Sequence, residues 1–331
     1  MNSGSTESNP RGAGLGGEVA APGGTAVAEE DAAPATNGDP GPEKARSLAG
    51  DAWRDLRRNP VFLISSGIVL VLIVMAAFPS LFTNADPRYC NLQFSRQAPG
   101  DGSLLGYDLQ GCDIYARTVY GARASILVGV FATVVVCVVG SLIGMFAGFY
   151  GRWVDALLSR FTDIFFAIPL LLGAIIVLAT FPSGQGTAEW VTIAKVVLAL
   201  GVLGWTSVTR IMRSTVIQVK QADYVQAARA LGGGTRRILM RHVLPNAMAP
   251  VIVYATITLG VFIGVEATLS FLGIGLQPPV ISWGIAINSA QDYVRQSPHM
   301  LLIPSAFLSV TVLAFIMLGD AVRDAFDPKL R

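Results

Sequence analysis

Residues 121–151, "GARASILVGVFATVVVCVVGSLIGMFAGFYG", contain one of six long apolar runs in the chain. A helix needs about 20 apolar residues to cross a hydrocarbon layer of about 30 Å. Gly140, Gly144 and Gly148 recur every four residues and therefore share one helical face. Because small residues let helix backbones approach closely inside lipid, the run predicts a membrane-spanning helix packed tightly against another helix. The pattern does not say which helix that is.

The composition of the whole chain agrees with this prediction. Hydrophobic residues make up 52% of the chain and charged residues only 14%, whereas soluble proteins carry about 25% charged residues. Apolar runs of this length predict an all-α polytopic membrane protein with six transmembrane helices. The third and fifth runs contain proline or ionisable residues, so breaks in the helix are expected there. The expected spans are Val61–Phe82, Gly121–Phe149, Phe161–Phe181, Trp190–Val208, Ala247–Leu276 and Met300–Leu318.

The segments before the first span differ from the rest. Residues 1–46 are rich in Gly, Ala and Pro and contain no aromatic residue, which predicts a disordered tail. This tail is either an inert extension or a recruitment arm. Residues 47–60 place apolar side chains at helical spacing beside arginines, which predicts an amphipathic helix at the membrane interface. The six-helix membrane domain is expected over residues 61–320 and a short C-terminal segment over residues 321–331.

Lys and Arg concentrate in alternate loops, most densely between Arg210 and Arg241. Cytoplasmic loops carry an excess of these residues. We therefore expect both termini and residues 216–245 in the cytoplasm, and residues 84–116 outside the cell. The expected location is the inner or plasma membrane, with membrane lipid as the surrounding partner. The arginines lie at membrane boundaries without interleaved aromatic residues, so no nucleic-acid partner is predicted.

The outer loop holds Cys90 and Cys112, the two cysteines that lie outside the apolar runs. On an oxidising face of the membrane they form a candidate disulfide. It would close a loop of about 22 residues and contribute about 3 kcal/mol. Two free thiols are the alternative.

Residues 222–247, "ADYVQAARALGGGTRRILMRHVLPNA", predict two helical pieces separated by a glycine turn. Tyr224, Ala227, Ala228 and Leu231 fall at i, i+3, i+4 and i+7, so they share one helical face. The small residues on this face leave room for another surface to come close, which favours a rigid docking element over a flexible tether.

Asp223 and Thr235 are expected to cap the two helical pieces of this element.

This stretch resembles the EAA loop of permease subunits in ATP-binding-cassette importers. That loop has the pattern E-A-A, three residues, G, nine residues, I-x-L-P. "QAARALG" followed after nine residues by "HVLP" departs from it at Gln226, where Glu is usual, and at His242, where Ile is usual. The residues that match at the family spacing are Ala227, Ala228, Gly232, Leu244 and Pro245.

Further blocks are similar to the C-type permease subunit of dipeptide and oligopeptide importers, over about Trp53 to Pro328. They are "LGYDLQGCDIYARTVYGAR", "GFYGRWVDALLSRFTDIFFAIP", "SFLGIGLQPPVISWG" and "LGDAVRDAFDP". Cys112 stands where the subfamily usually has Arg, and Tyr107 where it has Thr, which suggests a variant outer loop.

The resemblance implies a type I ABC importer permease fold. It also implies a second permease subunit, two ABC ATPase subunits, an extracellular substrate-binding protein and a short peptide as substrate. The residues that it implies in coupling to the ATPase are Asp223, Gln226, Ala227, Ala228, Gly232, His242, Leu244 and Pro245.

Glu266 is the candidate for the translocation path. A carboxylate at the centre of an apolar helix costs about 2.5–3.5 kcal/mol and normally faces a cavity or a partner. A paired structural carboxylate is the alternative. In another span, Arg160 and Asp163 are three residues apart on one helical face, which predicts a local ion pair.

The sequence offers little for catalysis. It contains no G-x-x-x-x-G-K-[ST] motif, so ATP hydrolysis must come from a partner and the chain is not expected to be an enzyme. His242 and His299 are expected on opposite sides of the membrane, so no metal site and no cofactor are predicted.

Three other functions stay open. The first is a permease of the same family that imports nickel, glutathione or another small solute. The second is a stand-alone secondary transporter, and the third is a membrane scaffold.

Overall fold

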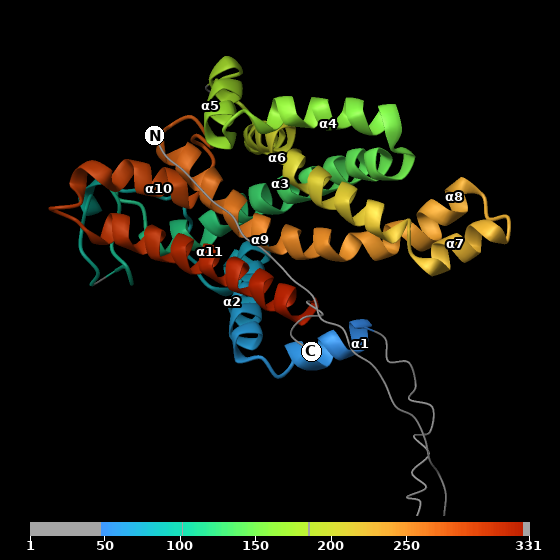
Figure 1. Cartoon of the computed structure of the whole chain (residues 1–331). Coiled ribbons are helices and arrows are strands. Elements are labelled where there is room, and N and C mark those ends of the chain that lie inside the picture. Colours follow the sequence, from blue (N-terminus) through green and yellow to red (C-terminus); the bar gives the residue numbers. More distant parts are fainter. Residues whose placement is uncertain (1–47, 101, 185, 327–331) are drawn as a thin grey trace, which may run out of the picture. The chain divides into compact units, whose positions relative to one another are not determined.

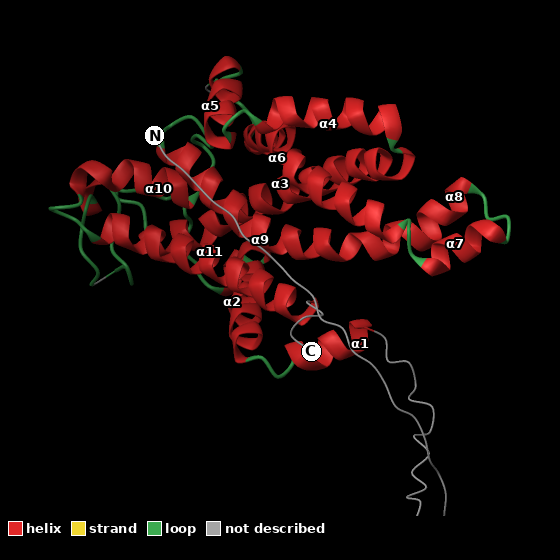
Figure 2. Cartoon of the chain, viewed as in Figure 1, coloured by secondary structure: helices red, strands yellow, loops and turns green. Residues whose placement is uncertain are grey.

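The computed structural model describes residues 48–326 except 101 and 185 (Figure 1). Within these residues the chain is helical and has no extended strand (Figure 2). The tail predicted over residues 1–46 and the last five residues lie outside the described part. The helices are α1 (Leu48–Leu56), α2 (Pro60–Ala77), η1 (Pro79–Leu81), η2 (Leu92–Phe94), α3 (Ile114–Tyr150), α4 (Arg152–Phe166), α5 (Leu170–Thr180), α6 (Glu189–Val219), α7 (Asp223–Ala230), α8 (Thr235–Ile238), η3 (Leu239–Val243), α9 (Leu244–Phe271), α10 (Trp283–Ala290), η4 (Gln291–Tyr293) and α11 (His299–Phe326).

Five helical stretches among the described residues are long and apolar enough to cross a membrane. They are α2, α3, α6, the continuous stretch that ends with α9, and α11. The pair α4 and α5 passes the same test together but bends by 79° at its break. The predicted all-α membrane fold with six spans is confirmed, provided that this bent pair counts as one span.

One of the two expected breaks is present and the other is not. The third predicted span is interrupted between α4 and α5, where Pro169 has no N–H to donate and disfavours the helical conformation of the residue before it. The break expected in the fifth span is absent: α9 continues through Pro250, and the π-helical turn η3 joins it to α8. The second span begins earlier than predicted because the Asp113 side chain accepts a hydrogen bond from the backbone N–H of Ala116, at 2.8 Å.

The glycine stripe of α3 lies directly against α6. A Cβ atom at Gly144 would lie 2.5 Å from the carbonyl oxygen of Thr209, and one at Gly140 would lie 2.6 Å from that of Trp205. The Thr209 hydroxyl donates to the carbonyl of Gly140 at 3.2 Å. No side chain longer than hydrogen fits at either glycine without moving the backbone of α6. The partner that the sequence left unnamed is therefore α6.

The short helix α10 was not predicted. It packs against α9 and α11, and its first residue, Trp283, is fully buried. The indole N–H of Trp283 donates to the carbonyl of Thr118 in α3 at 2.9 Å. The Ser282 hydroxyl caps the helix by accepting from the backbone N–H of Ile285 at 3.3 Å.

Two regions lie at opposite ends of the helices. The turn between α7 and α8 extends beyond the end of α6 and the start of α9 (Figure 1). The long connection that precedes α3 lies at the other end, beside the start of α11 (Figure 1).

We predict that Gly144→Ala destabilises the protein by about 1–3 kcal/mol, because the new methyl group must push α6 away from α3. The measurement is reversible unfolding in mixed micelles with increasing SDS. Gly67→Ala is the matched control, since nothing lies within 4 Å of a Cβ atom at that position. Equal shifts for the two variants would contradict the close packing.

Candidate functional site

The protruding element formed by α7 and α8 turns at three glycines. Gly232 adopts φ +78°, a conformation that favours glycine, and a Cβ atom there would meet nothing within 4 Å. The N–H of Gly233 donates to the carbonyl of Ala228 at 2.9 Å, and that of Leu231 donates to the carbonyl of Ala227 at 3.0 Å. These bonds end α7 in a defined turn rather than a loose loop.

The base of this element is held to the membrane helices. Val225 and Ile238 are buried and belong to the main hydrophobic core. The Lys220 ammonium, at the end of α6, donates to the carbonyl of Gly148 in α3 at 2.6 Å. The Gln226 amide nitrogen donates to the carbonyl of Lys220 at 3.1 Å. The element is therefore joined to the ends of both α3 and α6.

The outer face of the element is apolar in the middle and basic around it. The side chains of Tyr224 and Leu231 are exposed, with 46% and 88% of the residue surface accessible. An open hollow of about 710 Å³ lies beside α8. Large exposed apolar groups with a polar surround are typical of a protein-binding surface. The exposed cations around them are Arg229, Arg236, Arg237 and Arg241.

The predicted coupling residues divide into two groups. Asp223, Gln226, Ala227 and Ala228 lie in α7, and Gly232 lies in the turn that follows it. The second group lies along the entry into α9, where His242 and Leu244 are half-buried and Pro245 is exposed.

The predicted caps are wrong. The N-cap positions of α7 and α8 are Ala222 and Gly234, and neither receives a side-chain hydrogen bond. Asp223 and Thr235 are instead the first helical residues of their helices.

Two ion pairs join α4 to α6 at the end of the helices that carries α7 and α8. Arg213 donates from Nη2 to Asp155 at 2.7 Å, and Arg210 donates to Asp163 at 2.9 Å. The guanidinium of Arg210 also lies 3.6 Å from the ring centroid of Phe166. The predicted pair between Arg160 and Asp163 is therefore wrong, because the Asp163 carboxylate is taken by α6.

The loop that precedes α3 is cross-linked at the other end of the helices by a disulfide between Cys90 and Cys112. Beside it, the backbone N–H of Asn91 donates to the carbonyl of Gly111 at 3.1 Å. Arg117 donates to the Asp108 carboxylate at 2.7 Å, and the same carboxylate accepts from the backbone N–H of Cys112 at 2.9 Å. These contacts hold the loop against the first turns of α3.

Glu266 is fully buried in α9. The Ser270 hydroxyl donates to its Oε1 atom at 2.7 Å, whereas Oε2 has no hydrogen-bond partner among the described residues. Ser125 of α3 and Ser282 at the start of α10 flank the same carboxyl. Glu266 lies where α3, α9 and the start of α10 meet, and its hydrogen-bond partner is the Ser270 hydroxyl rather than a cation of the described chain.

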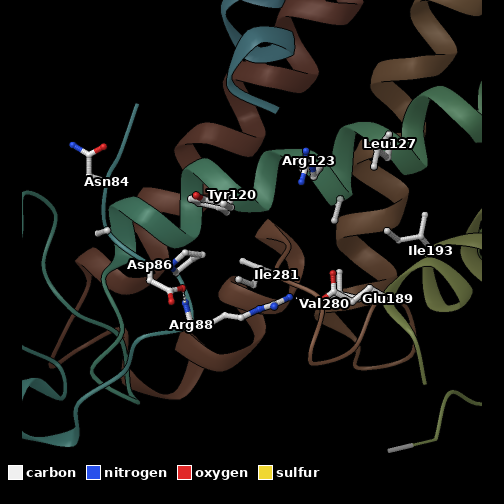
Figure 3. A pocket seen from close by; sticks show the side chains of 13 residues that line it. Asn84, Asp86, Arg88, Tyr120, Arg123, Leu127, Glu189, Ile193, Val280 and Ile281 are labelled. Carbon is white, nitrogen blue, oxygen red and sulfur yellow. Dashed lines mark hydrogen bonds and ion pairs between the residues drawn. The ribbon is translucent and has the colours of Figure 1, made fainter. Parts of the chain in front are cut away.

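A cavity of about 470 Å³ lies near the disulfide-bearing loop and was not predicted (Figure 3). Figure 3 shows Arg88, from this loop, extended toward Glu189 at the start of α6, with which it forms an ion pair. Tyr120, Arg123 and Leu127 approach the cavity from one face of α3. Arg123 could have indicated this cavity from the sequence, because it is an arginine inside an apolar run. Counting the charged residues of the loops alone does not include it.

The helices define a multi-pass membrane protein with a protruding element, α7 and α8, at one end. Residues 140–331 match the family described as the binding-protein-dependent transport system inner membrane component. Residues 47–99 match the N-terminal TM domain of oligopeptide transport permease C. The chain belongs to the family of binding-protein-dependent transport system inner membrane components, in agreement with the resemblance found in its sequence.

Relatives of the chain align over most of both sequences. The oligopeptide transport system permease protein OppC of Bacillus subtilis is 36% identical over 289 residues, which cover 87% of this chain and 92% of that protein. The dipeptide transport system permease protein DppC of Alkalihalophilus pseudofirmus is 36% identical, with 85% and 90% covered. The glutathione transport system permease protein GsiD of Pectobacterium atrosepticum is 35% identical, with 84% and 90% covered.

A solved structure shows the same fold. A chain of the inward-facing MetNI methionine ABC transporter aligns with a TM-score of 0.50 at 18% identity. The alignment covers 63% of this chain and 96% of that chain.

We predict that the protein isolated from its native membrane contains a Cys90–Cys112 cross-link, because the backbone of the loop pairs the two residues and the Asp108 carboxylate fixes the Cys112 amide. Mass spectrometry of peptides alkylated without reduction measures this. Cys137, which is a free thiol in the structure, serves as the internal control for alkylation after denaturation. Alkylated thiols at both Cys90 and Cys112 would show that the bond does not form.

Proposed function

We propose that the chain is a transmembrane subunit of an ATP-driven importer of short peptides, and that α7 and α8 dock on a cytoplasmic ATPase. The observation that carries this proposal is the protruding element, whose base is hydrogen-bonded to α3 and which exposes an apolar face. Three of its features suit a docking role: a fixed turn at Gly232, an apolar centre and a basic surround.

The docked element would transmit movement to several spans at once. The end of α6 leads directly into α7, and the Lys220–Gly148 hydrogen bond connects it to α3. On the other side, α8 continues through η3 into α9 without a loop. A displacement of the element by closing ATPases therefore reaches α3, α6 and α9 through helices and short contacts rather than through flexible segments.

The energy source lies outside this chain. Its sequence has no phosphate-binding G-x-x-x-x-G-K-[ST] motif. We therefore propose a complex with two ABC ATPase subunits, a second permease subunit and an extracellular substrate-binding protein. The chain itself acts as a permease rather than as an enzyme.

The charge distribution supports one orientation in the membrane. Arginines surround the protruding element, and cytoplasmic loops are enriched in such residues. We propose that this element and both termini lie in the cytoplasm, and that the disulfide-bearing loop lies outside an inner or plasma membrane.

Short peptides are the proposed substrates because two of the relatives above are named as oligopeptide and dipeptide permeases. Glutathione is the second candidate, since a glutathione permease is 35% identical to this chain. Uptake of a labelled dipeptide in competition with an excess of glutathione separates the two candidates.

We predict that Ala228→Trp abolishes peptide uptake while the protein still inserts into the membrane. Ala228 lies on the face of α7 that carries Tyr224 and Leu231, so an indole there blocks the close approach of a partner. Uptake is measured in cells whose importer contains this chain, and the ATPase retained on purification of the complex is measured in parallel.

Ala230→Trp is the matched control, because Ala230 is an exposed alanine of α7 that points away from that face. It is expected to keep most of the uptake and the bound ATPase. Normal uptake by the Ala228→Trp variant would count against the docking role.

A further inference from the structure

The cavity shown in Figure 3 is assembled from four separate parts of the chain. Residues 84–88 contribute one wall, α3 the second, the start of α6 the third, and Val280 and Ile281 the fourth. Its volume of about 470 Å³ lies within the range of small-ligand sites, about 300–1,000 Å³.

Arg123 is the unusual residue in this cavity. It lies within the membrane-spanning helix α3 and is exposed, and it makes no hydrogen bond or ion pair with any described residue. Arg123 lies in the first third of α3, toward the end that carries the disulfide-bearing loop. Ionisable residues within a span normally face a water-filled cavity or a partner charge. Tyr120, Arg123 and Leu127 are spaced i, i+3 and i+7, so the helix turns this guanidinium toward the cavity.

The other charges of the cavity are arranged differently. Arg88 and Glu189 neutralise each other, although both side chains remain partly exposed, at 64% and 43%. The Asp86 carboxylate accepts a hydrogen bond from the backbone N–H of Arg88 at 2.9 Å through one oxygen only. The cavity therefore presents a guanidinium without a partner in the described chain and, at its edge, a carboxylate with a free oxygen.

We propose that this cavity binds the terminal carboxylate of a short peptide on its way through the importer, with the Arg123 guanidinium as the group that binds it. This inference rests on the proposed function. A guanidinium presents parallel N–H donors that match the two oxygens of a carboxylate. The Asp86 carboxylate, on the same cavity, suits the ammonium group at the other end of the peptide.

The proposed substrate is short. Two or three extended residues span about 7–11 Å. The backbone amides between the two termini can be hydrated, so side-chain identity has little influence at this site. The site selects for the charged ends that all short peptides share.

The test uses the whole importer, with this chain and its partner subunits, in cell membranes. The probe is a dipeptide that carries a photoreactive benzophenone side chain and a free carboxylate, and a second probe carries a C-terminal amide instead. We expect the first probe to cross-link to α3 beside Tyr120 and the amide to cross-link much less. We expect Arg123→Gln to lower uptake of a free-carboxylate dipeptide about tenfold.

Two further variants define the role of the charge. Arg123→Lys keeps a cation and is expected to retain uptake within about threefold of the wild type, with weaker cross-linking because the bidentate geometry is lost. Arg295→Gln is the matched control, because Arg295 is exposed in the described chain and does not line this cavity. It is expected to leave uptake and cross-linking unchanged.

Three results would overturn the inference. Wild-type rates of uptake by Arg123→Gln would show that the guanidinium does not bind substrate. Equal cross-linking by the acid and the amide would show that the carboxylate is not recognised. Loss of the second permease from purified Arg123→Gln complexes would assign Arg123 to an interface between subunits. A different result would be that the wild-type importer takes up no peptide at all. That result would contradict the proposed function itself, and the proposed peptide site would then fall with it.

Discussion

The structure depends on the direct contact between the backbones of α3 and α6. Inside lipid, apolar side chains gain little by leaving the hydrocarbon, so helices associate through close packing and interhelical hydrogen bonds. The stripe of Gly140, Gly144 and Gly148 provides both, since it places carbonyl oxygens of α6 where Cβ atoms would otherwise be and receives the hydroxyl of Thr209. The proposed sites at the two ends of the molecule are both built on this helix pair.

At one end, α6 leads into α7, and the Lys220 side chain reaches α3. At the other end, the same two helices form walls of the cavity that contains Arg123 and Glu189. The proposed ATPase surface and the proposed peptide site are therefore connected by one rigid helix pair. The ion pairs of Arg210 and Arg213 add α4 to this unit at the end that carries α7.

Much of the fold and of the protruding element formed by α7 and α8 was predictable because the responsible signals are local. Apolar runs indicate spans, the spacing of Ala227, Ala228 and Gly232 indicates the helix α7 and its turn, and the cysteine pair indicates a cross-linked loop. The short helix α10 was missed because its apolar residues are too few to resemble a span. The cavity was missed because its walls come from four separated segments, although Arg123 within an apolar run was a usable signal.

The sequence by itself determined that the chain crosses the membrane repeatedly as helices, because lipid offers no partners for exposed backbone groups and the length of an apolar run is then sufficient to identify a span. It also determined the family, through spaced motifs. Only the tertiary structure decided that Asp163 pairs with Arg210 rather than with Arg160, that Glu266 is enclosed between three helices, and that α6 is the partner of the glycine stripe. Each of these depends on contacts between residues far apart in the chain, which no local pattern specifies.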